Sequence, residues 1–356
     1  MTLRGFGIRR MFLTKLIVFL EFIFPNRVLT GMNWQIGSTG QTSVESEIIS
    51  LANVRIYSSR NKYLILGTDA KNLVVYGWGP GGTLSQKQKA SLPYALLPTR
   101  ILTRPVMISN FVAAETNLYH FYLHNILPYM WAKYTWNIPP ERVLLFLKRP
   151  TLYQQYVMEI LNISWTFRKN AVCCVDLKVI LLTRKVEEKS IAYFREKLNY
   201  SKLKFEAQKE SSPVERVYLA RRNRMPSNHG EIEKISNEYG YTTIYLEDLT
   251  AREQINLVCG VSHWIAGHGA GLVHLVWGTP KSLIELVPIL PDGSEFGDGC
   301  FERLFLGISP QGFYEAMKFT LMADSDLRGE EEKKGSDSHG EISLEQLRRS
   351  LKKIHA

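Results

Sequence analysis

Apolar runs of strand length alternate with amphipathic helical segments along most of the chain, and this alternation restricts the possible folds more than any other sequence feature. In the second half, strands are predicted at 217–220, 242–245, 263–266 and 283–287, and helices at 231–239, 251–259 and 271–277. The first half has strands at 143–147 and 179–182 and helices at 152–161 and 187–198. Such alternation forms parallel sheets covered by helices on both faces. The sequence therefore predicts an α/β protein with two Rossmann-like domains that face a cleft.

Breaks in this pattern give the predicted domain limits. A first Rossmann-like domain occupies 50–205 and includes short strands at 63–66 and 73–76. A linker rich in serine and proline follows at 206–214, and a second Rossmann-like domain occupies 214–322. The tail at 324–356 is charged and poor in aromatic residues, so we expect it to be flexible, with a short helix near 344–351.

The N-terminal segment, 1–30, is basic and amphipathic. Arg4, Arg9 and Arg10 precede an apolar run of 14 residues, which Lys15 and Glu21 interrupt. As a helix this run is ~21 Å long, too short to cross a hydrocarbon core of ~30 Å. Two alternatives remain open. Residues 4–24 lie on an anionic membrane surface, or they form a helix that packs on the body of the protein.

Charge and cysteine content narrow the functional classes. The chain of 356 residues has 44 basic and 34 acidic residues, a net charge of +10, concentrated in the N-terminal segment and at one strand end. This distribution favours small anionic ligands over nucleic acid. The four cysteines include no CxxC pair, which is typical of thiols in a reducing compartment. We therefore expect a cytoplasmic protein, with peripheral membrane attachment as the open alternative.

A glycine-rich turn follows the predicted strand 263–266. Gly267, Gly269 and Gly271 alternate with His268 and Ala270, and a helical pattern comes next. Glycine lets the backbone approach a ligand closely, and a helix start offers N–H groups to a phosphate. The spacing is not the GxGxxG dinucleotide fingerprint. Packing alone is the alternative reason for such glycines. We predict that residues 268–271 bind an anionic ligand.

A basic cluster ends the predicted strand 217–220. Arg221 and Arg222 follow that strand directly. Ligands of open α/β sheets bind beyond the carboxyl ends of the strands, and arginine can bind a phosphate through two N–H groups at once. We therefore predict that both arginines contact an anion, with a solvated basic loop as the alternative.

Two histidines share one face of a predicted helix. His120 and His124 stand four residues apart, on the same face as Asn117. Imidazole titrates near neutral pH and can serve as a base. The spacing also suits a zinc-binding pair, but the zinc-protease signature needs Glu at position 121, which is Phe, and no third ligand is evident. A catalytic pair, a zinc hydrolase and buried core histidines therefore remain as alternatives.

Metal-dependent sugar transferases carry a DxD motif after a buried strand. The one candidate, Asp324-Ser325-Asp326, lies instead at the start of the polar tail. We therefore expect no bound metal and no cofactor.

Taken in order, these segments resemble glycosyltransferase family 61. The matching residues are Asn117–His120, Tyr218–Arg222, Asn228, Glu253-Gln254-Ile255, His268–Leu272 and Leu283-Ile284-Glu285. The resemblance covers about 110–290. It implies an inverting transferase of the GT-B type, with the acceptor on the first domain and a nucleotide sugar, often UDP-linked, on the second. Glu285 joins the predicted donor-binding residues on this ground.

The chain departs from the family pattern in the helix with the two histidines. The family has Asp or Glu four residues after the first histidine, where this chain has His124, and the Leu-Pro that follows comes one residue later. His274 also stands where Asn is common. These differences leave the identity of the catalytic base open.

The resemblance and the motifs together predict an inverting glycosyltransferase that moves a sugar from a nucleotide-sugar donor to a glycan acceptor in surface or capsular polysaccharide synthesis. Arg221 and the amides of 269–271 would stabilise the leaving diphosphate, and His124 or His120 would accept the proton of the attacking hydroxyl. Asn117 is expected on the acceptor side. The main alternative is a non-catalytic glycan- or nucleotide-binding subunit of a polysaccharide assembly complex.

Overall fold

The fold is taken from a computed structural model. It describes residues 48–59, 62–67, 73–76, 99–109, 117–146, 149–167, 171–180, 182, 184–198, 214–222, 224–290, 292–297, 299–321 and 340–356. The predicted N-terminal segment 1–30 and the core of the predicted linker, 206–213, lie outside these residues.

The chain divides into two compact units. Unit 1 comprises Met1–Glu115, Thr135–Arg149 and Ser164–Arg184, and unit 2 comprises Thr116–Tyr134, Pro150–Ile163 and Lys185–Ala356. Our sequence-based limits placed a boundary between 205 and 214, and they remain a prediction. The division places the helix with His120 and His124 in the same unit as the glycine-rich turn.

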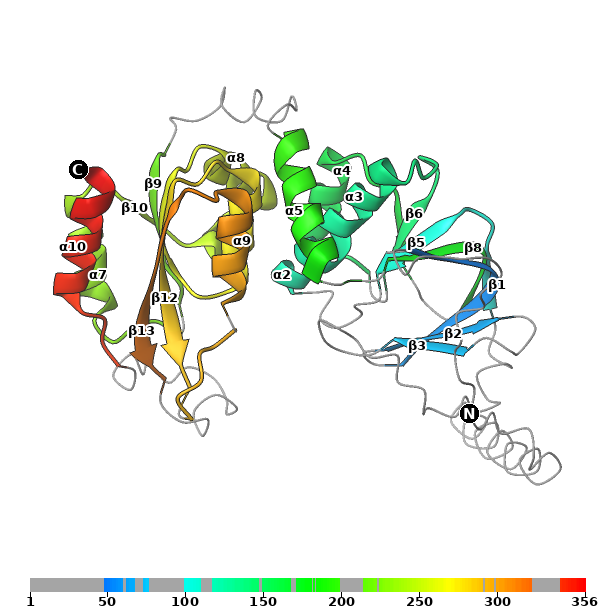
Figure 1. Ribbon diagram of the computed structural model, residues 1–356, viewed down its shortest axis with the longest axis horizontal. Coiled ribbons are helices and arrows are strands. Elements are labelled where there is room, and N and C mark those ends of the chain that lie inside the picture. Colours follow the sequence, from blue (N-terminus) through cyan, green and yellow to red (C-terminus); the bar gives the residue numbers. More distant parts are fainter. Residues whose placement is uncertain are drawn as a thin grey trace, which may run out of the picture. The chain divides into compact units, whose positions relative to one another are not determined.

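Unit 1 is built on a mixed sheet of eight strands (Figure 1). Its order is β3-β2-β1-β8-β5-β6-β7, with β4 also pairing β8. The strands β1 to β3 pair antiparallel, whereas β4 to β8 pair parallel. The bounds are β1 Ile48–Ser59, β2 Lys62–Gly67, β3 Leu73–Tyr76, β4 Thr99–Leu102, β5 Val106–Ser109, β6 Val143–Phe146, β7 Trp165–Phe167 and β8 Ala171–Ile180.

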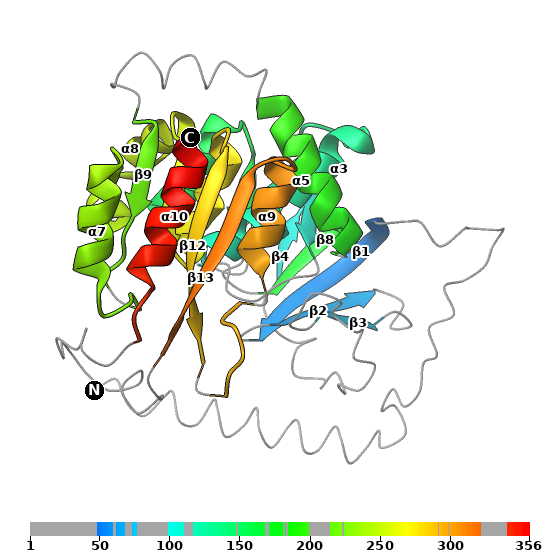
Figure 2. The same ribbon diagram turned by 60° about the vertical axis from the view of Figure 1, so that its left-hand side comes forward.

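Unit 2 is built on five parallel strands in the order β10-β9-β11-β12-β13 (Figure 2). They are β9 Arg216–Leu219, β10 Thr242–Ile244, β11 His263–Gly267, β12 Ser282–Ile289 and β13 Phe313–Thr320. The helices between them are α7 His229–Glu238, α8 Ala251–Cys259, α9 Cys300–Ile308 and the 3₁₀ helices η3 Leu246–Asp248 and η4 Ala270–Trp277, and α10 Leu344–His355 follows the last strand. Helices α7 and α10 cover one face of this sheet, and α8 and α9 lie on the other (Figure 1).

Five further helical segments precede this sheet among the described residues. They are α2 Leu118–Phe121, the π-helix η2 Tyr122–Ile126, α3 Leu127–Thr135, α4 Leu152–Ile160 and α5 Arg184–Leu198. Helices α4 and α8 each begin with a capping box, Thr151 with Gln154 and Thr250 with Glu253, which satisfies two backbone N–H groups at each start. Among the described helices, none has both the length and the apolarity to cross a membrane.

The predicted α/β class is confirmed. Both sheets contain five parallel strands, as a Rossmann-like fold requires, and the predicted helix 251–259 matches α8 at both ends. The sequence pattern missed α9 and β13 and read 271–277 as an α-helix, whereas η4 is a 3₁₀ helix. The predicted strand 179–182 is the end of the longer β8.

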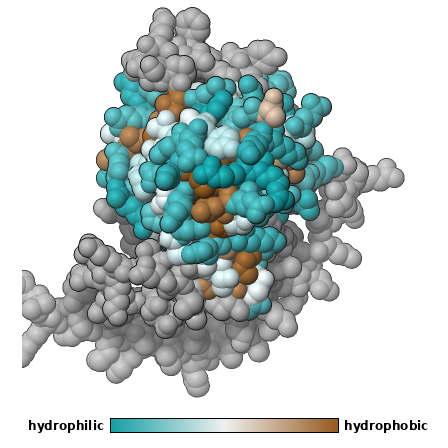
Figure 3. All heavy atoms as spheres, turned by 90° about the vertical axis from the view of Figure 1, so that its left-hand side faces the viewer, coloured by the Kyte–Doolittle hydropathy of each residue, from teal (hydrophilic) through white to brown (hydrophobic). Residues whose placement is uncertain are grey.

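The prediction of a flexible tail is wrong for residues 340–356. Helix α10 inserts Leu347 and Leu351, both fully buried, into the same core as Ile232 of α7 and Ile284 of β12. The Asn228 side chain donates to the Ile342 carbonyl at 2.8 Å and accepts from the Ile342 amide at 3.1 Å. The tail is charged because α10 is amphipathic, and the described surface of unit 2 on this side is largely hydrophilic (Figure 3).

Candidate functional site

The strand order of unit 2 fixes where a ligand would bind. Numbered within this sheet, the order is 2-1-3-4-5, and the chain reverses direction across the sheet between β9 and β11. In doubly wound sheets, ligands bind at such a switch point, beyond the carboxyl ends of the strands. Arg221 follows β9 and the glycine-rich turn follows β11. The structure therefore brings together the two segments that the sequence predicted separately.

Arg221 lies directly on the glycine-rich turn. Its Nη1 donates to the carbonyl oxygen of His268. A Cβ atom at Gly269 would come within 1.8 Å of that Nη1, and one at Gly267 within 2.8 Å of the Met225 Sδ. A side chain at either glycine would displace the Arg221 guanidinium or the Met225 thioether, which here pack directly on the backbone of the turn. Burial and the nearby charge of Arg224 lower the Arg221 pKa, yet arginine stays charged at neutral pH.

The helix after the turn begins with Gly269 as its N-cap and is η4. Its first bond runs from the Leu272 amide to the Gly269 carbonyl at 2.9 Å. The amides of Ala270 and Gly271 belong to the first turn, where helix geometry gives no intrahelical acceptor. The N-cap residue Gly269 lies against the Arg221 guanidinium, so this cation lies next to the start of the helix.

His268 is held by a buried carboxylate. Its Nδ1 lies 2.5 Å from Oε1 of Glu285, and the other oxygen of Glu285 accepts from the Tyr314 hydroxyl at 2.8 Å. His268 is 5% exposed and Glu285 is 1% exposed. Glu285 faces His268 because its neighbours Ile284 and Leu286 point into the core on the opposite face of β12. This bond places a proton on Nδ1 and fixes the orientation of the ring.

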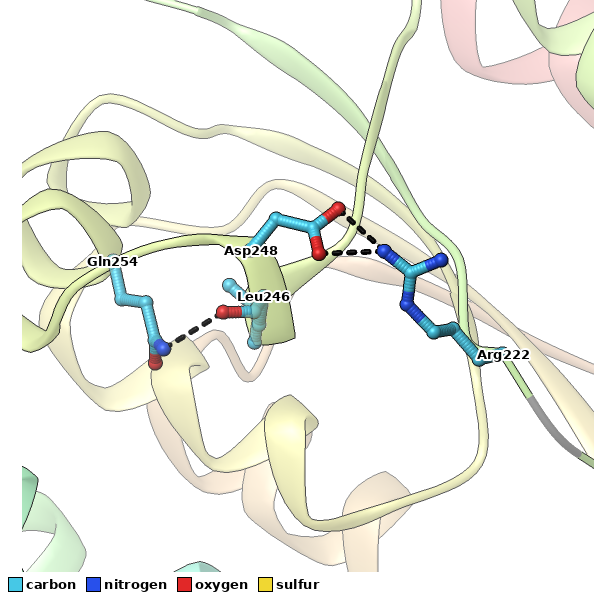
Figure 4. A network of polar contacts seen from close by, with 4 residues as sticks. All are labelled: Arg222, Leu246, Asp248 and Gln254. Carbon is cyan, nitrogen blue, oxygen red and sulfur yellow. Dashed lines mark hydrogen bonds and ion pairs between the residues drawn. The ribbon is translucent and has the colours of Figure 1, made fainter. Parts of the chain in front are cut away.

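Arg222 does not join Arg221. Its Nη2 contacts both carboxylate oxygens of Asp248, at 2.5 and 2.7 Å, and its guanidinium lies 5.1 Å from the Tyr245 ring centre (Figure 4). Both side chains of this pair are mostly exposed. The structure thus separates two adjacent arginines, one on the glycine-rich turn and one at the surface.

Gln254, part of the Glu-Gln-Ile match, connects two of the 3₁₀ helices. Its Nε2 donates to the carbonyl oxygens of Leu246 at 2.8 Å and Leu249 at 3.0 Å, and its Oε1 lies 3.2 Å from Nε2 of His274 in η4 (Figure 4). His274 is fully buried, and burial lowers its pKa to about 3. Gln254 and His274 therefore help to hold η4 in position behind the glycine-rich turn.

His120 and His124 face each other at the start of the first helical segment of unit 2. Their Nδ1 atoms are 3.0 Å apart and their rings are stacked at 4.9 Å. A hydrogen bond in this contact needs a proton on one Nδ1 and none on the other, so one proton lies between the two Nδ1 atoms. Burial, and next the neighbouring His120, lower the His124 pKa to about 3, and burial also lowers the His120 pKa.

The histidine pair lies at a π-helical turn. The Leu127 amide bonds to the Tyr122 carbonyl, five residues back, and the Asn125 side chain donates to the His120 carbonyl at 3.1 Å. A π-helical turn accommodates one extra residue in a helix and often lies at a functional site. The late Leu-Pro in the sequence is the signal of this extra residue.

Asn117, predicted on the acceptor side, is the N-cap of α2. Its side-chain oxygen accepts a hydrogen bond from the Tyr119 amide at 2.9 Å. Asn117 thereby fixes the start of the helix that carries the histidine pair.

A buried polar chain joins this helix to η4. The Trp277 Nε1 donates to the Tyr122 hydroxyl at 2.8 Å, and that hydroxyl lies 2.8 Å from the Tyr153 hydroxyl. The Tyr153 hydroxyl is in turn 3.4 Å from Nδ1 of His274. All of these side chains lie in unit 2. The polar ends of four large buried rings are thereby satisfied, and η2, α4 and η4 are tied together.

Aromatic contacts connect the histidine pair to His268. The Tyr119 ring packs edge-on against His120 at 5.4 Å and against Phe301 of α9 at 5.2 Å. Phe301 packs against His268 at 5.0 Å. Phe301 and Tyr314 were not singled out from the sequence, since α9 and β13 were not predicted.

Among the residues that the structure describes, no group of three His, Cys, Asp or Glu side chains is arranged to hold a metal ion. The two histidines direct their Nδ1 atoms at each other. This geometry gives the zinc-hydrolase alternative no support.

Comparison with known proteins bears on the resemblance seen in the sequence. The family model Glycosyltransferase 61 matches residues 101–284, about half of the chain, and this range contains the histidine pair, Arg221 and the glycine-rich turn. No curated protein matches the chain. The match covers α2, η2, β9, β11 and η4 but ends before Glu285, α9 and β13. Because it spans half of the chain, the chain belongs to glycosyltransferase family 61.

Proposed function

We propose that this protein is an inverting glycosyltransferase of GT-B architecture that moves a sugar from a nucleotide sugar, UDP-linked, to a glycan acceptor in surface or capsular polysaccharide synthesis. The observation that carries the proposal is the Arg221 guanidinium held against the start of η4 at the switch point of a parallel sheet. This arrangement suits a diphosphate, whose negative charge is spread over several oxygen acceptors.

The reaction is one displacement at the anomeric carbon. The acceptor oxygen forms a bond to that carbon while the bond to the diphosphate oxygen breaks, and the electron pair leaves with the diphosphate. Negative charge therefore grows on the phosphate in the transition state, where preorganised donors contribute most. Arg221 and the amides of Ala270 and Gly271 are the groups in position to stabilise it.

His268 and Glu285 complete the donor side in this proposal. Because the Nδ1 proton is bonded to Glu285, the Nε2 edge of His268 is the one directed away from the carboxylate. That edge lies against Gly297, where a Cβ would come within 2.5 Å of Nε2. The backbone near Gly297 and the ring of His268 would thus contact the sugar or phosphate together.

No metal takes part in this proposal. Metal-dependent transferases use a divalent cation to neutralise the leaving diphosphate, and here a guanidinium and a helix start would supply that charge. The N-terminal residues 4–24 would bring the enzyme to an anionic membrane surface, where polysaccharide precursors are assembled.

The acceptor side is formed by α2 and η2. A base must accept the proton of the attacking hydroxyl, and His120 and His124 are the candidates from the sequence. His124 is 7% exposed with a pKa of about 3, which makes it a weak base with little access to substrate. His120 is half-buried and remains the better placed of the two.

A panel of nucleotide sugars tests the proposal. A donor present at 100 times its dissociation constant should stabilise the protein by ~2.7 kcal/mol and raise its melting temperature. The bound donor should then release nucleoside diphosphate at a rate that EDTA does not change. Binding without release, with any acceptor glycan tried, would instead indicate a non-catalytic binding subunit. A requirement for a divalent cation would refute the metal-free mechanism.

A further inference from the structure

A carboxylate from α5 reaches the acceptor side of the site. Oε1 of Glu187 accepts a hydrogen bond from the Tyr119 hydroxyl at 3.5 Å, and Glu187 is half-buried. Tyr119 is the residue whose ring contacts both His120 and Phe301. Three elements that are distant in sequence, α2, α5 and α9, therefore meet around this carboxylate within unit 2.

Electrostatic effects connect Glu187 to Tyr119 and to the first residue of α9. Burial raises the Tyr119 pKa, and the charge of Glu187 raises it further. Cys300, the first residue of α9, has a pKa raised to about 12 by burial, by Glu285 and, more weakly, by Glu187. Both carboxylates therefore raise the pKa of the same thiol, Glu187 from the proposed acceptor side and Glu285 from the proposed donor side.

The histidine pair meets the needs of a base less well. A general base needs access to the substrate hydroxyl and must hold the proton that it takes. His124 is nearly enclosed, and the Nδ1 atoms of both rings are engaged in the contact between them. Burial lowers the pKa of both rings and thereby disfavours their imidazolium forms.

We infer that Glu187 is the general base of the proposed transfer. As the acceptor oxygen bonds to the anomeric carbon, the proton of its hydroxyl passes to a carboxylate oxygen of Glu187, and the diphosphate leaves with the electron pair of the broken bond. Tyr119 orients the carboxylate through its hydroxyl, and the histidine pair supports the ring of Tyr119. This role depends on the proposed function, because it assigns a base to that reaction.

The competing role for Glu187 is structural, as the hydrogen-bond acceptor of Tyr119. Substitutions distinguish the catalytic role from the structural role. Glu187→Gln keeps an oxygen that accepts from Tyr119 but cannot take a proton. Tyr119→Phe removes the hydroxyl and leaves the carboxylate. Glu188→Gln, at the exposed next position of α5, is the matched control for a lost charge.

The experiment measures UDP release by the full-length protein. The probe is whichever of UDP-glucose, UDP-N-acetylglucosamine and UDP-xylose raises the wild-type melting temperature most, with water or a glycan as acceptor. Expected results are a fall of at least ~10²-fold in kcat for Glu187→Gln with donor affinity unchanged, and a fall of less than ~10-fold for Tyr119→Phe. Glu187→Asp should retain more activity than Glu187→Gln, and Glu188→Gln should match the wild type.

Two results would overturn the inference, and they are distinguishable from each other. If Glu187→Gln turns over within about threefold of the wild type while His120→Gln is inactive, the base is His120 and the proposed function stands. If no UDP-sugar shifts the melting temperature of the wild type, the proposed function fails and the inference fails with it.

Discussion

Unit 2 contains two histidine clusters that differ in their partners. In the first, His120 faces His124 with the two Nδ1 atoms 3.0 Å apart. In the second, Nδ1 of His268 lies 2.5 Å from a carboxylate that is itself bonded by Tyr314. Both clusters are largely buried, so the partner decides what each ring can do. A second imidazole allows one proton between the two Nδ1 atoms, whereas a carboxylate fixes the His268 tautomer and makes it a rigid part of the donor side.

Substitutions on the donor side should lower turnover more than substitutions at the histidine pair, and Arg221 should show the largest effect. We expect Arg221→Ala to lower turnover by ~10²–10³-fold, because the guanidinium stabilises charge on the leaving diphosphate. The measurement is steady-state release of nucleoside diphosphate, with circular dichroism to confirm the fold. Arg221→Ala with wild-type turnover would remove this residue from the site.

Replacing the Glu285 carboxylate would test the cluster of His268, Glu285 and Tyr314 directly. We expect Glu285→Gln to weaken donor binding and lower turnover by ~10-fold or more. The neutral side chain cannot accept from both His268 and Tyr314, so one buried group loses its partner at a cost of ~1–3 kcal/mol. Tyr314→Phe, which leaves the His268 bond intact, is the milder control. Calorimetric titration measures donor binding, and thermal unfolding measures stability. Equal losses in Glu285→Gln and Tyr314→Phe would contradict the importance given to the bond between Glu285 and His268.

The buried pair of imidazoles should make folding sensitive to acid. In the folded state the pKa of His124 and that of the buried His274 lie at about 3, below the value of ~6.5 in an unfolded chain. The unfolded state therefore takes up protons first as the pH falls. Stability should be full above pH ~6.5 and should fall by about 2 kcal/mol per histidine by pH 5.

Urea denaturation between pH 5 and pH 8 measures this effect. His124→Asn keeps a polar partner for His120 and removes one of the two depressed groups, so its free energy of unfolding should fall less steeply with acid than that of the wild type. A variant with the same slope as the wild type would show that His124 is not depressed by burial.

The smallest effect is expected at Arg222, next to Arg221. Its ion pair with Asp248 is solvent-exposed, and exposed pairs contribute little. We expect Arg222→Ala to change turnover by no more than about twofold. A loss as large as that of Arg221→Ala would mean that Arg222 leaves Asp248 to bind the donor.

The sequence by itself determined the α/β class, the family, and the two segments that meet at the switch point. These follow from local information: apolar periodicity, a strand that runs into alternating glycines, and arginines at a strand end. The late Leu-Pro also signalled the extra residue of the π-helical turn. Periodicity missed η4 as a 3₁₀ helix, because 3₁₀ and α-helices bury similar apolar runs.

The tertiary structure alone decided which of these residues act together. Arg221 and Arg222 are adjacent and chemically identical in the sequence, yet one lies on the turn after β11 and the other pairs with Asp248. His268 meets Glu285, and Tyr119 meets Glu187, across 17 and 68 residues of chain. The charged tail contributes α10 to the core through Leu347 and Leu351. Contacts at such separations depend on how the sheet and its helices pack, and no local pattern encodes them.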